Sequence, residues 1–114
     1  IPKALDAAGI TLDQVGVFEL HEAFAAQMLA NLRLLADPTF AREKLGRDQA
    51  VGEIPMDKLN AWGGSLSIGH PFGATGARLL MTAAQRMKAE NVEWGLISAC
   101  AAGALGHAMT IRRV

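Results

Sequence analysis

Side chains that can move protons near pH 7 are few in this sequence. The histidines are His21, His70 and His107, and the only cysteine is Cys100. A neutral imidazole can take a proton from a thiol or a hydroxyl, and a thiolate is both a nucleophile and a base. If the fold brings the thiol and an imidazole together, we expect acid–base or nucleophilic chemistry.

His70 lies in a glycine-rich stretch that holds five of the twelve glycines, from Gly63 to Gly76. Glycine is used where the backbone turns through positive φ or approaches another group closely. Pro71 restricts the backbone of the residue before it to extended conformations. We therefore expect a loop that fixes the direction of the His70 side chain. We also expect Thr75 to cap the helix that follows.

Other interpretations of these residues stay open at the level of sequence. The glycines could serve close packing alone, with His70 as an ordinary hydrogen-bonded residue and Cys100 as a small buried hydrophobe. A phosphate-binding loop is disfavoured because the spacing is not G-x-G-x-x-G and no lysine follows. A metal site made of the histidines and Cys100 is also disfavoured, since no pair has close ligand spacing.

The apolar pattern predicts the elements that must position these residues. In order, they are a helix over 2–8 ended by Gly9, a buried strand over 15–20, a well-covered helix over 22–35, a helix over 76–89, and strands over 94–99 and 107–111. In the helix over 76–89, we expect Leu80, Ala83, Ala84 and Met87 on the buried side. The charged residues, Arg86 among them, are expected on the other side.

Residues 37–60 differ from the rest, because they combine prolines, glycines and many charges. We expect a long connection with one helical turn at 40–45, serving as a lid or as a solvated insertion. The alternation of helices and strands indicates an α/β layered domain, in which ligands collect beyond the C-terminal ends of parallel strands. His21 and Cys100 are expected at such ends, and His70 at the same edge.

Composition limits the function classes. Lysine plus arginine equals aspartate plus glutamate, 11 each, which argues against nucleic acid or an anionic membrane as the main partner. No apolar run approaches the ~20 residues of a membrane span, and no signal peptide is visible. One cysteine excludes an internal disulfide and fits a reducing compartment. The chain begins Ile-Pro-Lys within a helical pattern, so we expect a piece of a longer protein.

Three motifs occur in a fixed order along the chain. They are His21-Glu22-Ala23-Phe24, then Gly69-His70-Pro71-Phe72-Gly73-Ala74-Thr75-Gly76, then Cys100-Ala101-Ala102-Gly103. In this order and spacing they resemble the C-terminal half of a thiolase, in particular the trifunctional-enzyme β-subunit type. The resemblance covers nearly the whole chain, including the long connection.

The resemblance implies a thiolase fold, in which two similar halves form a five-layer αβαβα protein. Residues 1–114 would form the C-terminal domain, a layered α/β/α half with a mixed sheet, an insertion at about 37–60 and its first strand missing. The implied activity is that of an acyl-CoA C-acyltransferase, a 3-ketoacyl-CoA thiolase of fatty-acid β-oxidation. The family's nucleophilic cysteine lies in the N-terminal half, so the chain alone is expected to be inactive.

The resemblance also implies residue roles. His70 matches the histidine that takes the proton from the nucleophile, and Cys100 matches the acid/base that exchanges a proton with the α-carbon of acetyl-CoA. The N–H of Ala102 matches an oxyanion-hole donor, although most members have glycine there. His21 stands where most members have an asparagine that holds a catalytic water. The remaining residues expected at the substrate are Gly103, Ala23, Phe24, Pro71 and Phe72, although Phe24 could equally serve helix packing.

The partners that the resemblance implies are acyl-CoA and CoA as substrates, with no bound cofactor, no metal and no nucleic acid. It further implies the missing N-terminal half, a homodimer or homotetramer, and a location in the bacterial cytoplasm or the mitochondrion. A complex with a hydratase/dehydrogenase subunit is compatible with it. The competing classes are a thiolase-like domain that serves only as a subunit interface or CoA-binding module, and a metal-binding regulator.

Overall fold

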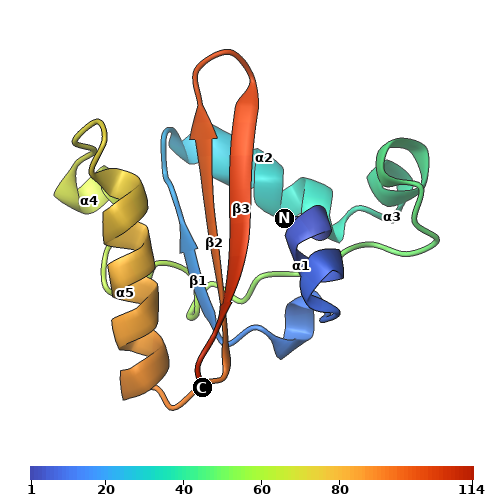
Figure 1. Ribbon diagram of the computed structural model, residues 1–114. Coiled ribbons are helices and arrows are strands. Elements are labelled where there is room, and N and C mark those ends of the chain that lie inside the picture. Colours follow the sequence, from blue (N-terminus) through green and yellow to red (C-terminus); the bar gives the residue numbers. More distant parts are fainter.

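A three-stranded mixed sheet lies at the centre of the computed structural model, which describes residues 1–114 (Figure 1). β1 (Val17–Leu20) pairs in parallel with β2 (Trp94–Ala101), and β2 pairs antiparallel with β3 (Leu105–Arg112). The predicted layered α/β architecture is confirmed. The two later strands extend beyond their predicted ends, so Cys100 lies inside β2 and not after it.

The helices surround this sheet. They are α1 (Pro2–Ala8), the 3₁₀ turn η1 (Leu12–Gln14), α2 (Ala25–Ala36), α3 (Pro38–Phe40) continuing into the π-helical η2 (Ala41–Leu45), α4 (Ser65–Ile68) and α5 (Thr75–Ala89). As predicted, α1 ends at Gly9, whose φ of 68° is left-handed. Such a C-terminal glycine accepts this conformation without steric cost.

Alternate residues of the strands supply two apolar layers, one on each face of the sheet. Leu96 of β2 packs with Phe18 and Leu20 against α1 and α2, whereas Ile97 packs with Val17 against α5. Figure 1 shows α5 on one side of the sheet and α1 and α2 on the other. This arrangement follows from the period-2 alternation of a strand that is buried on both faces.

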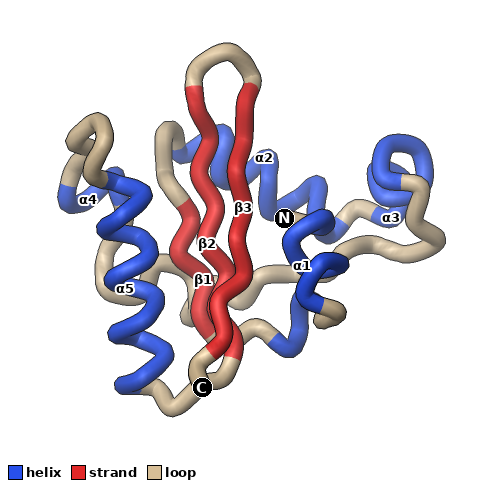
Figure 2. The backbone as a smooth tube through the Cα atoms, viewed as in Figure 1, coloured by secondary structure: helices blue, strands red, loops and turns tan.

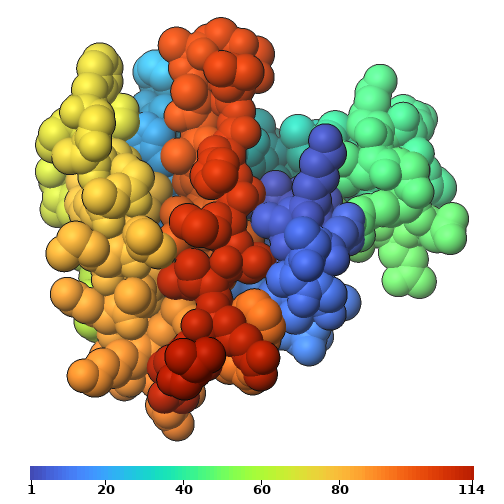
Figure 3. All heavy atoms as spheres, in the orientation of Figure 1, coloured from blue at the N-terminus to red at the C-terminus, as the bar shows by residue number.

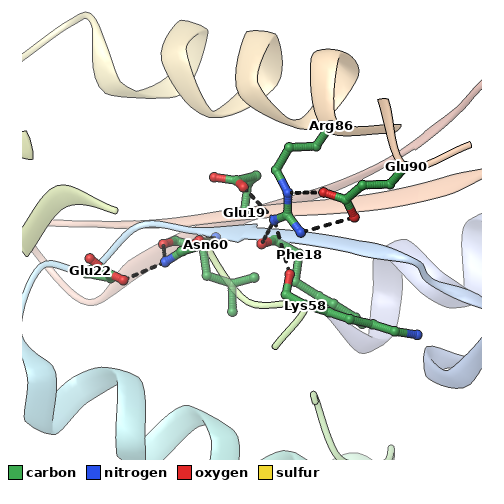
Figure 4. Close-up of polar contacts among 8 residues, drawn as sticks. Phe18, Glu19, Glu22, Lys58, Asn60, Arg86 and Glu90 are labelled. Carbon is green, nitrogen blue, oxygen red and sulfur yellow. Dashed lines mark hydrogen bonds and ion pairs between the residues drawn. The ribbon is translucent and has the colours of Figure 1, made fainter. Parts of the chain in front are cut away.

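Helix α5 corrects three predictions. Its buried side carries Leu79, Ala83, Arg86 and Met87, whereas Leu80 is 40% exposed and Ala84 is exposed as well. Arg86 was expected in solvent but is the largest fully buried side chain. Its guanidinium bonds Glu19 of β1 at 2.8 Å and Glu90 at 2.8 Å (Figure 4). A buried arginine needs such charged and hydrogen-bonded surroundings.

Helix α2 corrects the expectation of a well-covered helix over 22–35. It begins at Ala25, and only Met28 and Leu35 are buried. Phe24 precedes the helix in an extended conformation and is 72% exposed. Packing within the helix therefore does not explain Phe24.

The long connection takes the expected form, with one helical region followed by an irregular segment. Figure 3 shows α3 and η2 standing out from the body at one side. The segment then returns to the sheet, where Leu59 forms a parallel bridge with Phe18. No helix in the structure combines the length and apolar character that crossing a membrane requires.

Candidate active site

The C-terminal ends of β1 and β2 and the glycine-rich loop lie at the same end of the molecule (Figures 1 and 2). His21 directly follows β1, and its backbone N–H donates to Ser98 of β2 at 2.8 Å. This bond continues the strand pairing by one residue and fixes where the His21 side chain begins. The loop between α4 and α5 brings His70 to the same place.

The imidazole rings of His21 and His70 are in contact. Their centroids are 4.1 Å apart and the ring planes are inclined by 40°. The ring of Phe72 lies against the His70 ring, with a distance of 5.1 Å between the two centroids. His21 is buried and His70 is exposed. Two residues 49 positions apart in the sequence thus form one pair at the edge of the sheet.

Hydroxyl groups fix one ring nitrogen of each histidine. Nδ1 of His21 lies 2.8 Å from the Ser65 hydroxyl at the start of α4. Nδ1 of His70 lies 2.6 Å from the hydroxyl of Thr75. Thr75 was expected to cap α5, but Ala74 is the residue before the helix and Thr75 is already helical. Its hydroxyl is therefore free to contact the histidine.

Arg78 of α5 connects this pair to the glycine-rich loop. Its guanidinium donates to the Ser65 hydroxyl at 2.8 Å and to the Gly69 carbonyl at 2.7 Å. Gly69 has a φ of 89°, a left-handed value that favours glycine over other residues. The arginine thus holds the loop at the turn just before His70.

The surroundings of His21 lower its pKa. Burial is the main cause, because it disfavours the charged imidazolium. The neighbouring His70 imidazole and the Arg78 guanidinium act in the same direction, while the Glu22 carboxylate opposes them. His21 is therefore held as a neutral imidazole at neutral pH, able to donate one hydrogen bond and accept another.

The Glu22 carboxylate ties α4 to the end of β1. It accepts from the Leu66 backbone N–H at 3.0 Å and from the Asn60 amide at 2.7 Å. Asn60 in turn exchanges two 2.8 Å bonds with the backbone of Leu20, and Figure 4 shows Asn60 beside Glu22. A Cβ added to Gly64 would overlap this carboxylate, so the close approach requires glycine.

Cys100 lies in an open pocket of about 460 Å³ between the β2–β3 hairpin and α2. The thiol is exposed, which corrects the interpretation of Cys100 as a small buried hydrophobe. His21 and His107 also line this pocket, together with Gln27 and Asn31 of α2. His70 is not among the lining residues, so His21 is the residue that connects the stacked pair to the cavity that holds Cys100.

The other predicted site residues surround this edge. Ala102 and Gly103 form the exposed turn between β2 and β3, where Gly103 has a φ of 83°. Ala23 is half-buried between His21 and α2. Pro71 and Phe72 are exposed in the loop, and Phe72 is 91% exposed. Nowhere in the structure do three histidine, cysteine or carboxylate side chains converge as a metal ion would require.

The arrangement offers groups that can transfer protons. An imidazole pair can take and give one proton, and an exposed thiol can act as a second acid/base. The apolar side chains that line the pocket beside Cys100, such as Leu34 and Leu105, suit an uncharged part of a substrate.

Sequence reasoning missed the residues that hold the histidines, namely Ser65, Arg78, Glu22 and Asn60. Ser65 was not recognised because the short helix α4 lies inside a stretch that looked like continuous loop. For Arg78 there was a signal. It lies in the first turn of the expected helix, close enough to reach back to the loop.

Comparisons with known proteins agree on one family. The model of the thiolase C-terminal domain matches residues 1–113. The chain is 54% identical over 110 residues to the bovine mitochondrial trifunctional enzyme subunit β, covering 96% of the chain and 23% of that protein. It is 57% identical over 111 residues to a probable 3-ketoacyl-CoA thiolase of Caenorhabditis elegans, covering 97% and 25%. A 3-ketoacyl-CoA thiolase of Yersinia pestis (strain Pestoides F) is 54% identical over 110 residues, covering 96% and 25%.

Proposed function

The chain belongs to the thiolase family, whose C-terminal domain it matches, and from this premise we propose that it is the acid–base part of a 3-ketoacyl-CoA thiolase. It spans about a quarter of the length of the curated relatives that it matches. In this proposal the nucleophilic cysteine comes from a part of the protein outside residues 1–114. The single cysteine of the chain is then left for the second role.

The reaction needs two proton-transfer groups in different places. In thiolysis, one group takes a proton from the nucleophilic thiol so that it can attack the 3-keto carbon, and the bond between the α- and β-carbons breaks. The enolate of acetyl-CoA that leaves must then receive a proton on its α-carbon. We assign the first role to His70 and the second to Cys100, which afterwards regains its proton from the incoming CoA thiol.

The remaining residues bind the substrate in this proposal. His21 donates its N–H to a water or to the thioester oxygen, and the Ala102 N–H stabilises an oxyanion beside Gly103. The exposed apolar side chains Phe24 and Phe72, with Ala23 and Pro71, contact the pantetheine part of CoA. CoA is thus substrate and product, and the reaction balances without a bound cofactor.

One observation carries the proposal, namely the position of His21. Its ring contacts His70, and it lines the pocket that contains Cys100. The N–H donor of His21 therefore lies between His70 and Cys100, the two groups to which we assign proton transfer. The names of the relatives support a place in fatty-acid β-oxidation, in a bacterium or a mitochondrion, and assembly with further subunits.

The test uses the full-length protein that carries this chain, with Cys100→Ala and His70→Ala variants. Cys100→Ala should abolish exchange of the α-protons of acetyl-CoA with deuterated water, while acylation of the nucleophile remains measurable. His70→Ala should slow acylation itself, by about 100-fold or more. Wild-type exchange in Cys100→Ala would contradict the role assigned to the thiol. Absence of acetoacetyl-CoA thiolysis by the wild type would contradict the proposed activity.

A further inference from the structure

The hydrogen bonds around His21 have a fixed direction. Arg78 can only donate, so the Ser65 hydroxyl accepts from it at 2.8 Å. The hydroxyl proton of Ser65 must then go elsewhere, and the Nδ1 of His21, 2.8 Å away, is its other polar neighbour. This nitrogen therefore accepts a bond from Ser65. In a neutral imidazole, the proton then sits on Nε2.

The hydrogen bonds around His70 run in the opposite direction. The Pro71 carbonyl can only accept, and the Thr75 hydroxyl lies 3.4 Å from it. When Thr75 donates to this carbonyl, its oxygen accepts from Nδ1 of His70, 2.6 Å away. The proton of His70 then sits on Nδ1, and its Nε2 carries a free lone pair.

We propose that the stacked histidines are held in opposite tautomers, with His21 presenting an N–H donor and His70 presenting a basic nitrogen. Ser65 and Arg78 set the first tautomer, and Thr75 with the Pro71 carbonyl sets the second. These are positioning residues, since none of them needs to touch a substrate. The idea deepens the proposed function and rests on it for its catalytic meaning.

The geometry explains how one pair of identical side chains can serve two purposes. Two rings with centroids 4.1 Å apart cannot both carry a positive charge cheaply, so a charge on one ring disfavours a charge on the other. A hydrogen-bond donor and a proton acceptor then lie side by side. The other charged or titratable groups that face His21 are the Glu22 carboxylate, Arg78 on α5, and His107 and Cys100 across the pocket.

The test measures the tautomers directly by ¹⁵N NMR of the full-length protein labelled at histidine, at a pH where both rings are neutral. Ring nitrogens with and without a proton resonate in separate regions. We expect the proton of His21 on Nε2 and that of His70 on Nδ1. Ser65→Ala should mix the tautomers of His21 and leave His70 unchanged. The matched variant Thr75→Val should do the reverse.

Kinetics of the same variants separate positioning from general loss of structure. Ser65→Ala should lower kcat about tenfold with KM nearly unchanged, the effect of one lost hydrogen bond, and Ser65→Thr should restore most of the rate. Equal tautomers in the wild type, or unchanged His21 tautomers in Ser65→Ala, would overturn the inference. Inactive wild-type protein with opposite tautomers would instead overturn the proposed function alone.

Discussion

Arg86 shows at the scale of one residue how this chain tolerates charge in its interior. The guanidinium is bonded to Glu19 and Glu90 and also donates to the carbonyls of Phe18 and Lys58 (Figure 4). Burial raises the pKa of Glu19 because it disfavours the carboxylate, and Arg86 opposes this shift. For Arg86, burial acts to lower the pKa, but the hydrogen bonds to Glu90 and Glu19 outweigh it and raise the value.

Replacing Arg86 with methionine should therefore destabilise the β1–α5 packing strongly. The change leaves the Glu19 carboxylate buried without its partner, which costs about 3–5 kcal/mol. Hydrogen exchange of the α5 amides, measured by mass spectrometry in the full-length protein, should accelerate accordingly. The control is Arg112→Met, since the ion pair of Arg112 with Glu93 is exposed and contributes less than about 1 kcal/mol.

A second variant separates charge from packing at this site. In Arg86→Met combined with Glu19→Leu, no buried charge remains, and much of the lost protection should return. Equal exchange rates in wild type and Arg86→Met would show that the buried pair does not hold α5 to the sheet.

At the scale of elements, helix α5 shows what the spacing of apolar residues can and cannot predict. The three- and four-residue spacing of its apolar residues placed the helix correctly to within one residue, with Ala83 and Met87 on the buried side. The side chain of Arg86 shares that side, because Glu19 of a distant strand compensates its charge. A single sequence does not show which strand will lie opposite, so arginine was assigned to solvent.

The residues of the candidate site also fall into those that the sequence indicates and those that only the fold brings in. His21, His70 and Cys100 were recognisable as candidates because their types can move protons and because they lie at strand ends or in a glycine-rich loop. The residues that orient them depend on contacts between elements 44 and 13 positions apart, as Ser65 shows with His21 and Arg78. No local pattern encodes such contacts, and the pairing of β1 directly with β2 is equally a property of the folded chain.

The packing of α4 on Glu22 gives the prediction at this scale. Gly64→Ala places a methyl group against the Glu22 carboxylate and should break its bonds to Leu66 and Asn60. Ser65 then moves away from His21, and thiolysis by the full-length protein should fall at least tenfold, about the effect of one lost hydrogen bond. The melting temperature should fall by only a few degrees, since α4 has four residues.

Gly76→Ala is the matched control for this change. Gly76 lies in α5, and a Cβ added there meets no atom within 4 Å. Alanine in a helix is more stable than glycine by roughly 0.5–1 kcal/mol, so this variant should retain activity and melt slightly higher. If Gly64→Ala behaves like Gly76→Ala, the bonds of the Glu22 carboxylate to Leu66 and Asn60 do not position the histidines.

At the scale of the whole molecule, exposed apolar side chains indicate where the chain contacts other parts of the protein. Large apolar residues lie on α4 and the outer side of α5, where each is at least 40% exposed; they are Leu66, Ile68, Leu80 and Met81. Exposed patches of this kind mark interaction surfaces. The relatives are about four times as long as the chain, and we infer that the remaining part of the protein covers this surface.

The isolated chain should therefore be catalytically inactive. Mixed with acetoacetyl-CoA and CoA, residues 1–114 have an imidazole pair and a thiol for proton transfer but no separate nucleophile to hold the acyl group. Thiolysis is measured by the loss of absorbance of the enolised 3-ketoacyl thioester. Its rate should equal the rate without protein. Co-expression with the rest of the full-length protein should restore turnover if the exposed side of α4 and α5 is the contact surface. A Leu80→Asp or Met81→Asp change should then block that restoration, whereas turnover by the isolated chain would show that Cys100 acts as nucleophile and acid/base at once.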